Sequence, residues 1–193
     1  MPYKPYKSYK SYTNKGGYES LVVYWLGTTI YDLTVVFCKS YLSYNSIKSY
    51  TRTYDQMIQA ARSGKQNIVE GSLENSTEGN LKLIGVAKAS YGELLEDYKD
   101  YLRQNNLPLW DKEDSRVMQI RKTRDLPNKP YKSYKSYMSY TKKPEDFANL
   151  LVTLCFKQGY LLSCLLKGIE NKFIRQGGFR ENLFKKRREF MQK

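Results

Sequence analysis

Histidine is absent from the 193 residues of this chain, which removes the most common general base and the most common metal ligand. Cysteine is scarce as well: Cys38, Cys155 and Cys164 make an odd number, with no C-x-x-C pair. This pattern indicates neither a disulfide framework nor a zinc site. All three cysteines lie in apolar stretches with helical periodicity, where a free thiol usually acts as a small hydrophobic side chain. The sequence therefore predicts a reduced protein with no metal ion and no cofactor.

Long apolar runs are also missing. No segment approaches 18 consecutive apolar residues, and the first 20 residues are mainly Tyr, Lys and Ser, unlike the apolar region of a signal peptide. From this we expect a soluble, cytoplasmic protein with no membrane segment.

Acidic residues are few at the ends of the sequence. The chain holds 33 Lys and Arg against 19 Asp and Glu, for a net charge of +14. Residues 1–15 contribute +4, residues 129–143 contribute +5 and residues 180–193 contribute +4, which leaves only +1 for the remainder. A basic periphery on an almost neutral body indicates nucleic-acid contact or a role in solubility.

Tyrosine is abundant, and 11 of the 19 tyrosines stand in three related Tyr-Lys-Ser repeats at residues 1–13, 39–51 and 129–141. Tyr recurs at every third position, a period that matches neither an α-helix nor a strand. The Lys and Ser between the tyrosines leave little to bury, so extended segments are predicted.

Two interpretations of the repeats are open. They are either basic, aromatic arms for single-stranded nucleic acid, or repeat expansions tolerated at a terminus and in two loops between helices. The second explains all three positions without a function, and we prefer it. It predicts that deleting residues 1–14 and 129–141 changes the free energy of unfolding by less than about 1 kcal/mol.

Four long segments have apolar residues at helical spacing, over residues 18–39, 52–71, 81–102 and 144–176. The first is rich in β-branched residues that would also suit a strand, but its length of about 20 residues favours a helix. A shorter polar helix is expected within residues 111–124.

Residues at the ends of these segments are typical of helix termini. Ser76 is a candidate N-cap of the third helix, and Pro144 suits the first turn of the fourth. Gly71 is a candidate C-terminal cap of the second helix, and Gly177 and Gly178 end the fourth.

Four helices of this length predict an all-α fold, an antiparallel up-and-down four-helix bundle. The bundle is expected over residues 18–179, with the repeats at 39–51 and 129–141 inserted in its loops. A low-complexity N-terminal arm, residues 1–17, precedes it, and a basic C-terminal tail, residues 180–193, follows it.

The stretch RTYDQMIQAARSGKQNIVEGS, residues 52–72, resembles the four helix bundle suffix domain family, bacterial proteins seen especially in Bacteroidetes. Two further stretches are similar to the same family: KASYGELLEDYKDYLRQNNLPLW, residues 88–110, and the ending FIRQGGFRENLFKKRREF. The Tyr-Lys-Ser repeats interrupt the resemblance. It implies a small four-helix bundle that often forms a ring-shaped homo-oligomer such as a pentamer, and it implies no activity for the family itself.

A more distant similarity concerns an alanine pair followed by an N-I-A-E-G segment. Here it reads Ala60-Ala61 and then Asn67 to Gly71, with Val69 in place of the usual Ala. The segment is similar to one in proteins encoded in intervening sequences of ribosomal RNA genes, and in accessory variability determinants of diversity-generating retroelements. The retroelement group implies a basic surface that engages nucleic acid and a reverse transcriptase.

The same segment has a structural and a functional interpretation. Small residues such as Ala60, Ala61 and Gly71 allow close helix packing, while Asn67 and Glu70 could fix the register or pair with a basic residue. The structural interpretation is preferred. In the functional one, Arg62 and Lys65 join a phosphate-binding surface.

Four carboxylates lie within two turns of the third segment: Glu93, Glu96, Asp97 and Asp100. Without a histidine, they cannot complete the di-metal pattern of ferritin-like bundles or a nucleophile triad. We interpret them as a solvated acidic face, and we expect no enzyme activity.

The tail offers the strongest nucleic-acid signal, because consecutive cations neutralise phosphates without sequence preference. The expected contact residues are Arg180, Lys185, Lys186, Arg187 and Arg188, with Arg62 and Lys65 secondary. The sequence thus predicts an oligomeric, non-enzymatic bundle that binds RNA or DNA. The alternative is a protein-interaction or self-assembly module without a nucleic-acid role.

Overall fold

The computed structural model describes residues 17–42, 48–123 and 130–192, and every regular element in these ranges is a helix. The elements are η1 (Tyr18–Ser20), α1 (Val22–Tyr41), α2 (Lys48–Leu73), α3 (Thr77–Gln104), α4 (Ser115–Lys122), α5 (Pro130–Tyr137), η2 (Met138–Lys142), α6 (Pro144–Gln176) and α7 (Phe179–Met191). The all-α prediction is confirmed for the described residues. The first Tyr-Lys-Ser repeat and the centre of the second, residues 43–47, lie outside them.

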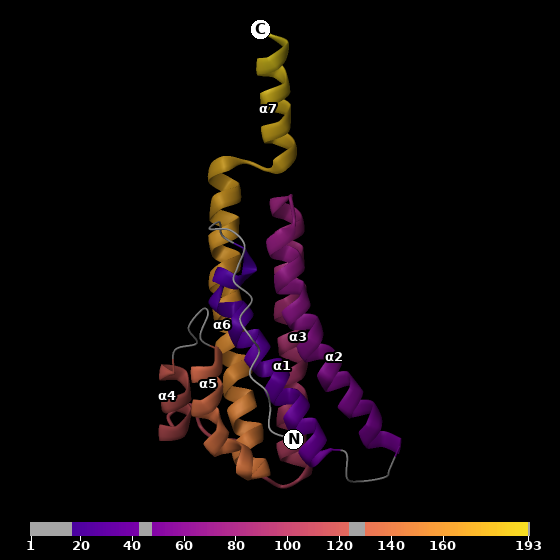
Figure 1. The fold of residues 1–193 in the computed structure, drawn as a ribbon, viewed down its shortest axis with the longest axis vertical. Helices are drawn as coiled ribbons and strands as arrows, with labels where there is room; N and C mark the ends of the chain where they lie inside the picture. The colour runs from indigo at the N-terminus through magenta and orange to yellow at the C-terminus, as the bar shows by residue number, and fades with distance from the viewer. Residues whose placement is uncertain (1–16, 43–47, 124–129, 193) are drawn as a thin grey trace.

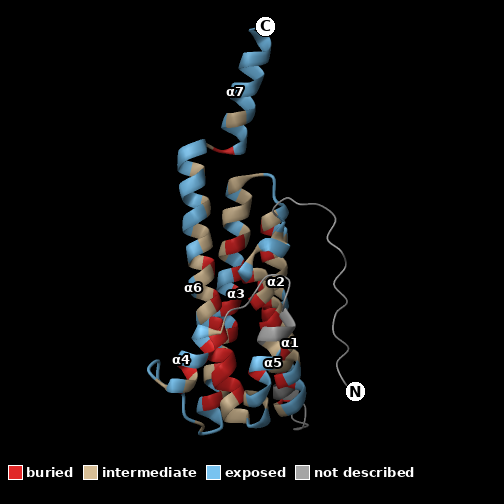
Figure 2. Cartoon of the chain, turned by 60° about the vertical axis from the view of Figure 1, so that its left-hand side comes forward, coloured by how far each residue is buried: buried red, intermediate tan, exposed pale blue. Residues whose placement is uncertain are grey.

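The four long helices lie side by side (Figure 1). Extensive contacts join α1 to α2 and α6, and α3 to α2 and α6. The two short elements α4 and η2 pack against α6, and α5 packs against α1. Figure 2 shows most buried residues in the half of the body where α4 and α5 lie, whereas α7 is largely exposed.

The expected helix ends are mostly correct. The Ser76 hydroxyl accepts a hydrogen bond of 2.9 Å from the Gly79 amide at the start of α3. At the other end of α6, Gly177 has a φ of 73°, a left-handed conformation that L side chains rarely adopt. This glycine therefore ends α6 as the sequence predicts.

Gly71 is not the end of its helix, and that prediction is wrong. α2 continues to Leu73, and Gly71 lies inside it, facing α3. A Cβ at this position would be 3.2 Å from the Cβ of Leu83 and 3.3 Å from Cδ1 of Ile84. The absence of a side chain at Gly71 therefore allows α2 and α3 to pack closely, and the backbone does not change direction there.

Tyr91 on α3 holds the long helices together. Its ring is buried against Gly64 of α2, where a Cβ would lie 2.7 Å from two ring carbons. Its hydroxyl reaches Gly27 of α1, where a Cβ would overlap the oxygen, and lies near Gln158 of α6. The two glycines therefore make room for one tyrosine that crosses the core.

The third Tyr-Lys-Ser repeat is helical, so the prediction of an extended segment is wrong for residues 130–141. Tyr137 is 1% exposed, and Tyr134 and Tyr140 pack partly buried against the core. The Tyr41 hydroxyl, from the second repeat, donates a 3.2 Å hydrogen bond to the Thr141 carbonyl. The described parts of the second and third repeats therefore contribute to the core, because α1 and α6 offer a surface for the aromatic rings that a sequence period cannot reveal.

The second repeat is not simply a loop either. Residues 39–41 belong to α1 and residues 48–51 to α2. Leu42, just after α1, is buried. Within the described residues, the repeat at 39–51 thus extends α1 and α2, whereas the repeat at 129–141 forms the separate elements α5 and η2.

Candidate nucleic-acid interface

The basic tail forms a helix, α7, that projects beyond the end of the long helices (Figure 1). A tight junction positions it. Gly178 is buried, and a Cβ there would lie 2.6 Å from the Glu78 carboxylate and 2.9 Å from the Phe173 ring. The Gly178 amide donates to the Glu181 carboxylate at 3.1 Å, which caps the new helix. Two consecutive glycines thus allow the chain to leave α6 and start α7 beside the first turn of α3.

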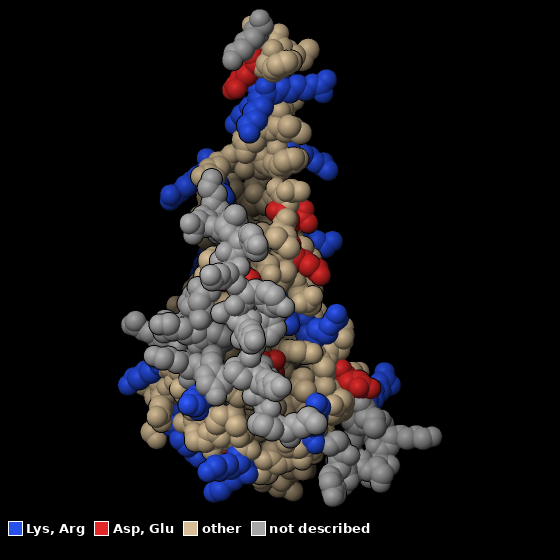
Figure 3. Space-filling model, in the orientation of Figure 1, with Lys and Arg blue, Asp and Glu red and all other residues tan. Residues whose placement is uncertain are grey.

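The predicted contact residues on α7 are all exposed. Arg180, Lys185, Lys186, Arg187 and Arg188 form no ion pair with any residue that the structure describes. Figure 3 shows Lys and Arg side chains projecting from this helix. Their charge is therefore available to an external anion.

Arg62 and Lys65 do not join this surface. They lie on α2 about 8–11 residues before its end, whereas Lys185 to Arg188 lie beyond the junction, so more than about 20 Å separates the two sets along the axis. The Lys65 ammonium stands 4.8 Å from the centre of the Tyr31 ring on α1, a cation–π contact. The structure gives Lys65 a packing partner and leaves Arg62 exposed.

The Ala60–Gly71 segment packs α2 against α3, as the structural interpretation expects of its small residues, but Asn67 and Glu70 do not fix the register within the described residues. Ala60 and Ala61 are buried, and the Ser63 and Ser90 hydroxyl oxygens are 3.1 Å apart between α2 and α3. Asn67 donates to the Ser63 carbonyl at 2.9 Å within its own helix and does not reach another helix in the described contacts. Glu70 is exposed and has no ion pair within the described residues.

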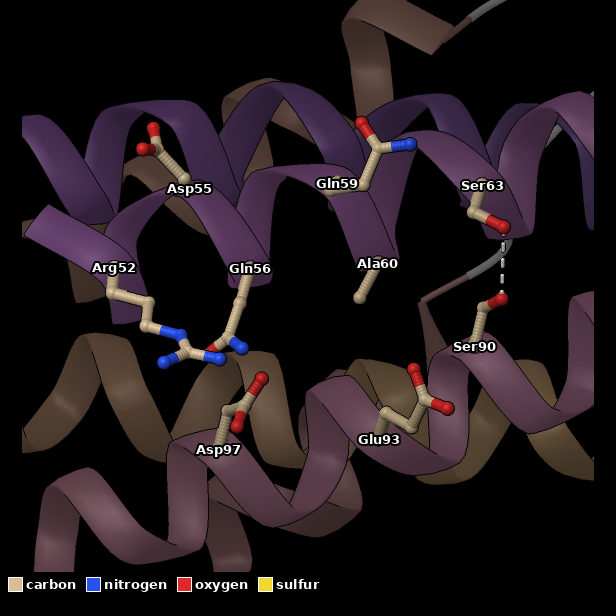
Figure 4. A pocket seen from close by; sticks show the side chains of 9 residues that line it. All are labelled: Arg52, Asp55, Gln56, Gln59, Ala60, Ser63, Ser90, Glu93 and Asp97. Carbon is tan, nitrogen blue, oxygen red and sulfur yellow. Dashed lines mark hydrogen bonds between the residues drawn. The ribbon is translucent and has the colours of Figure 1, made fainter.

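A cleft that the sequence does not reveal opens between the first half of α2 and the second half of α3. Its volume is ≈ 830 Å³. It is lined by Arg52, Asp55, Gln56, Gln59, Ala60, Ser63, Ser90, Glu93 and Asp97. Figure 4 shows Glu93 and Asp97 pointing from α3 towards α2, with Arg52 and Gln56 facing them. Three carboxylates against one guanidinium give this cleft a net negative charge.

The cleft carboxylates lack a partner. Neither Glu93 nor Asp97 forms an ion pair with a residue in the described ranges. Burial raises the pKa of Asp97, and the neighbouring Asp100 and Glu93 raise it further. The other two members of the predicted acidic face are different, because Glu96 pairs with Lys99 at 2.7 Å and Asp100 with Arg103 at 2.9 Å on the surface. The predicted acidic face is therefore divided: Glu96 and Asp100 form ion pairs on the surface, whereas Glu93 and Asp97 line the cleft without an ion pair to a described residue.

At concentrations where the chain is monomeric, replacing Asp97 with asparagine is expected to raise the free energy of unfolding at pH 7. The unfolded pKa of an aspartate is about 3.9, and the folded pKa is higher, so the wild type loses stability as pH rises through the interval between them. The difference in free energy of unfolding between Asp97→Asn and the wild type should thus be small below about pH 4 and largest at neutral pH. Urea unfolding at several pH values measures it, with the exposed Glu96→Gln as the control. A less stable variant at pH 7 would show that the carboxylate makes a favourable contact.

The cysteines are free thiols. Cys38 and Cys155 are buried, and burial, followed by the charge of Asp97, raises the pKa of Cys38 to about 12. Burial likewise raises the pKa of Cys155. Cys164 is exposed, so the expectation of a third core thiol is wrong. Across the described residues no group of three Cys, Asp or Glu could hold a metal ion.

One stretch, Pro144–Met191, contains an 18-residue window long and apolar enough to cross a membrane, with a mean hydropathy of 1.4. Half of that window is buried inside the protein, as in core helices that pass the same test. It is weak evidence for a membrane segment.

Comparison of the chain with protein-family models, with curated proteins and with solved structures gives no match. Membership of the four helix bundle suffix domain family therefore stays a prediction.

Proposed function

We propose that this protein is a non-enzymatic, oligomeric four-helix bundle that binds RNA or DNA through phosphate contacts made by α7. The observation that carries the proposal is the exposure of five cations that form no ion pair with a described residue, on a helix that projects from the body. Such a helix can approach a phosphate backbone without hindrance from the rest of the chain. Each cation that neutralises a phosphate releases counterions, which provides affinity without sequence preference.

In this proposal α1, α2, α3 and α6 form an antiparallel up-and-down bundle. The support is that the extensive contacts link them in a closed ring, from α1 to α2, α3, α6 and back to α1. The Tyr-Lys-Ser repeats are expansions, of which the described part of the second lies in α1 and α2 and the third forms α5 and η2. A cytoplasmic location stays part of the same proposal.

The test is fluorescence-anisotropy binding to a duplex DNA and a structured RNA across a salt series, with nuclease-treated protein. Replacing Lys185, Lys186, Arg187 and Arg188 with glutamine should weaken binding and reduce the slope of log K against log[salt] by up to about 4. The matched control replaces four exposed lysines of the body, Lys82, Lys122, Lys142 and Lys143, and removes the same charge.

The control should retain most of the affinity and the salt slope. An equal loss in both variants would mean that net charge, and not α7, drives binding. No binding by the wild type at low salt would contradict the nucleic-acid proposal.

A second candidate function is a protein-interaction module. The observation that favours it is the apolar surface of α7, where Phe184 is 63%, Phe190 82% and Met191 76% exposed. Large apolar side chains that gather on an exposed helix are typical of interaction sites. Capture of a protein by the wild type, with no affinity for either nucleic acid, would favour this function.

A further inference from the structure

α7 has an apolar face without a partner. The helix makes no extensive contact with another helix in the described part of the chain. Its exposed apolar side chains are Phe179, Leu183, Phe184, Phe190 and Met191. An isolated helix of 13 residues is marginal in water, and most of the stability of a protein helix comes from packing its apolar face. A binding partner for α7 is therefore expected.

Two arginines lie in the middle of this apolar face. At about 100° per residue, Phe179, Leu183 and Phe190 form one stripe, and Phe184 and Met191 form a second about 100° away. Arg180 and Arg187, two turns apart, fall between the two stripes. The partner of α7 must therefore offer negative charge to these two guanidinium groups.

This arrangement argues against two simple partners. A second copy of α7 carries the same five basic and two acidic residues, a net charge of +3, so the two helices would repel each other. The acyl region of a membrane would have to receive two guanidinium groups at the centre of the buried face, which is costly.

The cleft between α2 and α3 has the complementary charge, and its lining is polar apart from Ala60. Glu93 and Asp97 point into it and have no ion pair within the described residues. The part of α2 that lines it, residues 52–63, is about 17 Å long, and α7 is about 20 Å long. Charge, length and an open groove therefore agree with an amphipathic helix as occupant.

The occupant comes from another molecule. α7 begins beside Glu78, in the first turn of α3, and projects away from the body (Figure 1). Glu93 and Asp97 lie 15 and 19 residues further along α3, about 22–29 Å in the opposite direction. Reaching its own cleft would require α7 to reverse at the buried Gly178 junction.

We propose that α7 of one copy of this chain docks in the cleft between α2 and α3 of a second copy, with Arg180 and Arg187 facing Glu93 and Asp97. The docked helix keeps Lys185 on its outer side, whereas Lys186 and Arg188 lie at the two edges of the docked face, about 20° from Phe179 and about 40° from Phe184 around the helix. The inference rests on the oligomeric part of the proposed function. It assigns Arg180 and Arg187 to the cleft and leaves Lys185, Lys186 and Arg188 for phosphate contacts.

The first test is a charge exchange followed by sedimentation equilibrium of the full chain. One variant carries Arg180→Glu and Arg187→Glu, and the other carries Glu93→Lys and Asp97→Lys. Each alone should self-associate at least about 100-fold more weakly than the wild type, because like charges then meet in the interface. An equimolar mixture should recover association, because the reversed α7 of the first variant matches the reversed cleft of the second.

A second measurement does not depend on the stability of the cleft variants. In a Cys164→Ser background, a copy with Leu183→Cys is mixed with a copy with Gln59→Cys and treated with a bismaleimide. A covalent pair of the two copies is expected, and none when Gln59→Cys is replaced by Lys122→Cys on α4.

The proposal is overturned by a wild type that stays monomeric to its solubility limit, by a mixture that fails to recover association while both variants are folded, or by the absence of the cross-link. Neutralising Lys185, Lys186 and Arg188 should weaken association far less than the charge-exchange variants do, and it should reduce nucleic-acid affinity. Failure of one proposal is therefore distinguishable from failure of the other.

Discussion

Replacing Tyr137 with alanine is expected to lower the free energy of unfolding by about 3–5 kcal/mol, the range for large aromatic side chains removed from a core. Tyr137 is 1% exposed and belongs to the third Tyr-Lys-Ser repeat. The substitution leaves a cavity where α5 meets the core, and the surrounding helices can close it only in part. Urea unfolding followed by circular dichroism measures the change.

The control for this substitution is Met138→Ala, at the next position and 43% exposed, which should change stability by less than about 1 kcal/mol. A loss below about 1 kcal/mol for Tyr137→Ala would show that the repeat does not pack on the body. It would also restore the interpretation of the repeat as a tolerated expansion with no structural role.

Replacing Gly64 with alanine is expected to destabilise the protein by about 1–3 kcal/mol, although alanine is the better helix former. The added Cβ would lie 2.7 Å from two carbons of the Tyr91 ring. That ring is fully buried and cannot move without displacing α1 or α6. The helices would have to separate, and contacts along the α2–α3 interface would be lost.

The matched control is Gly92→Ala on α3, where a Cβ meets nothing within 4 Å. It should stabilise the protein by about 0.5–1 kcal/mol, since only the cost of a glycine in a helix is removed. Opposite signs for the two substitutions are the expected result in thermal and urea unfolding. Equal effects would contradict the close approach at Gly64.

A related pair of substitutions tests the other end of Tyr91. Gly27→Ala should be destabilising because its Cβ overlaps the tyrosine hydroxyl. Tyr91→Phe removes that oxygen, which has no hydrogen-bond partner among the described residues, and should be nearly neutral alone. The double variant should recover most of the loss, and a double-mutant cycle measures the coupling. Additive losses would mean that another atom limits the space at Gly27.

Several features of this protein follow from local sequence alone. Apolar residues at helical spacing predict the positions of α1, α2, α3 and α6, because one face of each helix must be buried whatever its partner. Ser76 and Gly177 mark helix ends for reasons that lie within one turn of backbone. The charge of the tail is likewise visible in the sequence, since exposed cations need no partner in the chain.

Other features depend on which residues meet in space. A glycine at position 71 is typical of a helix C-cap, but here it lies inside α2 and allows close packing against Leu83 and Ile84 of α3. The three-residue period of the repeats matches no buried face, and Tyr137 is nevertheless in the core because α1 and α6 leave room for its ring. Glu93 and Asp97 have the same spacing as a solvated pair, and only the separation of α2 from α3 makes them the wall of a cleft.

The sequence by itself thus determined the four long helices, the ends marked by Ser76 and Gly177, and the basic character of α7. Only the tertiary structure decided that the third repeat joins the core, that glycines accommodate Tyr91, and that an acidic cleft and an unpartnered amphipathic helix coexist in one chain. The physical reason is the range of the interactions. Helix formation and capping depend on neighbours within about four residues along the chain. Burial and charge complementarity depend on side chains that the sequence separates by tens of residues.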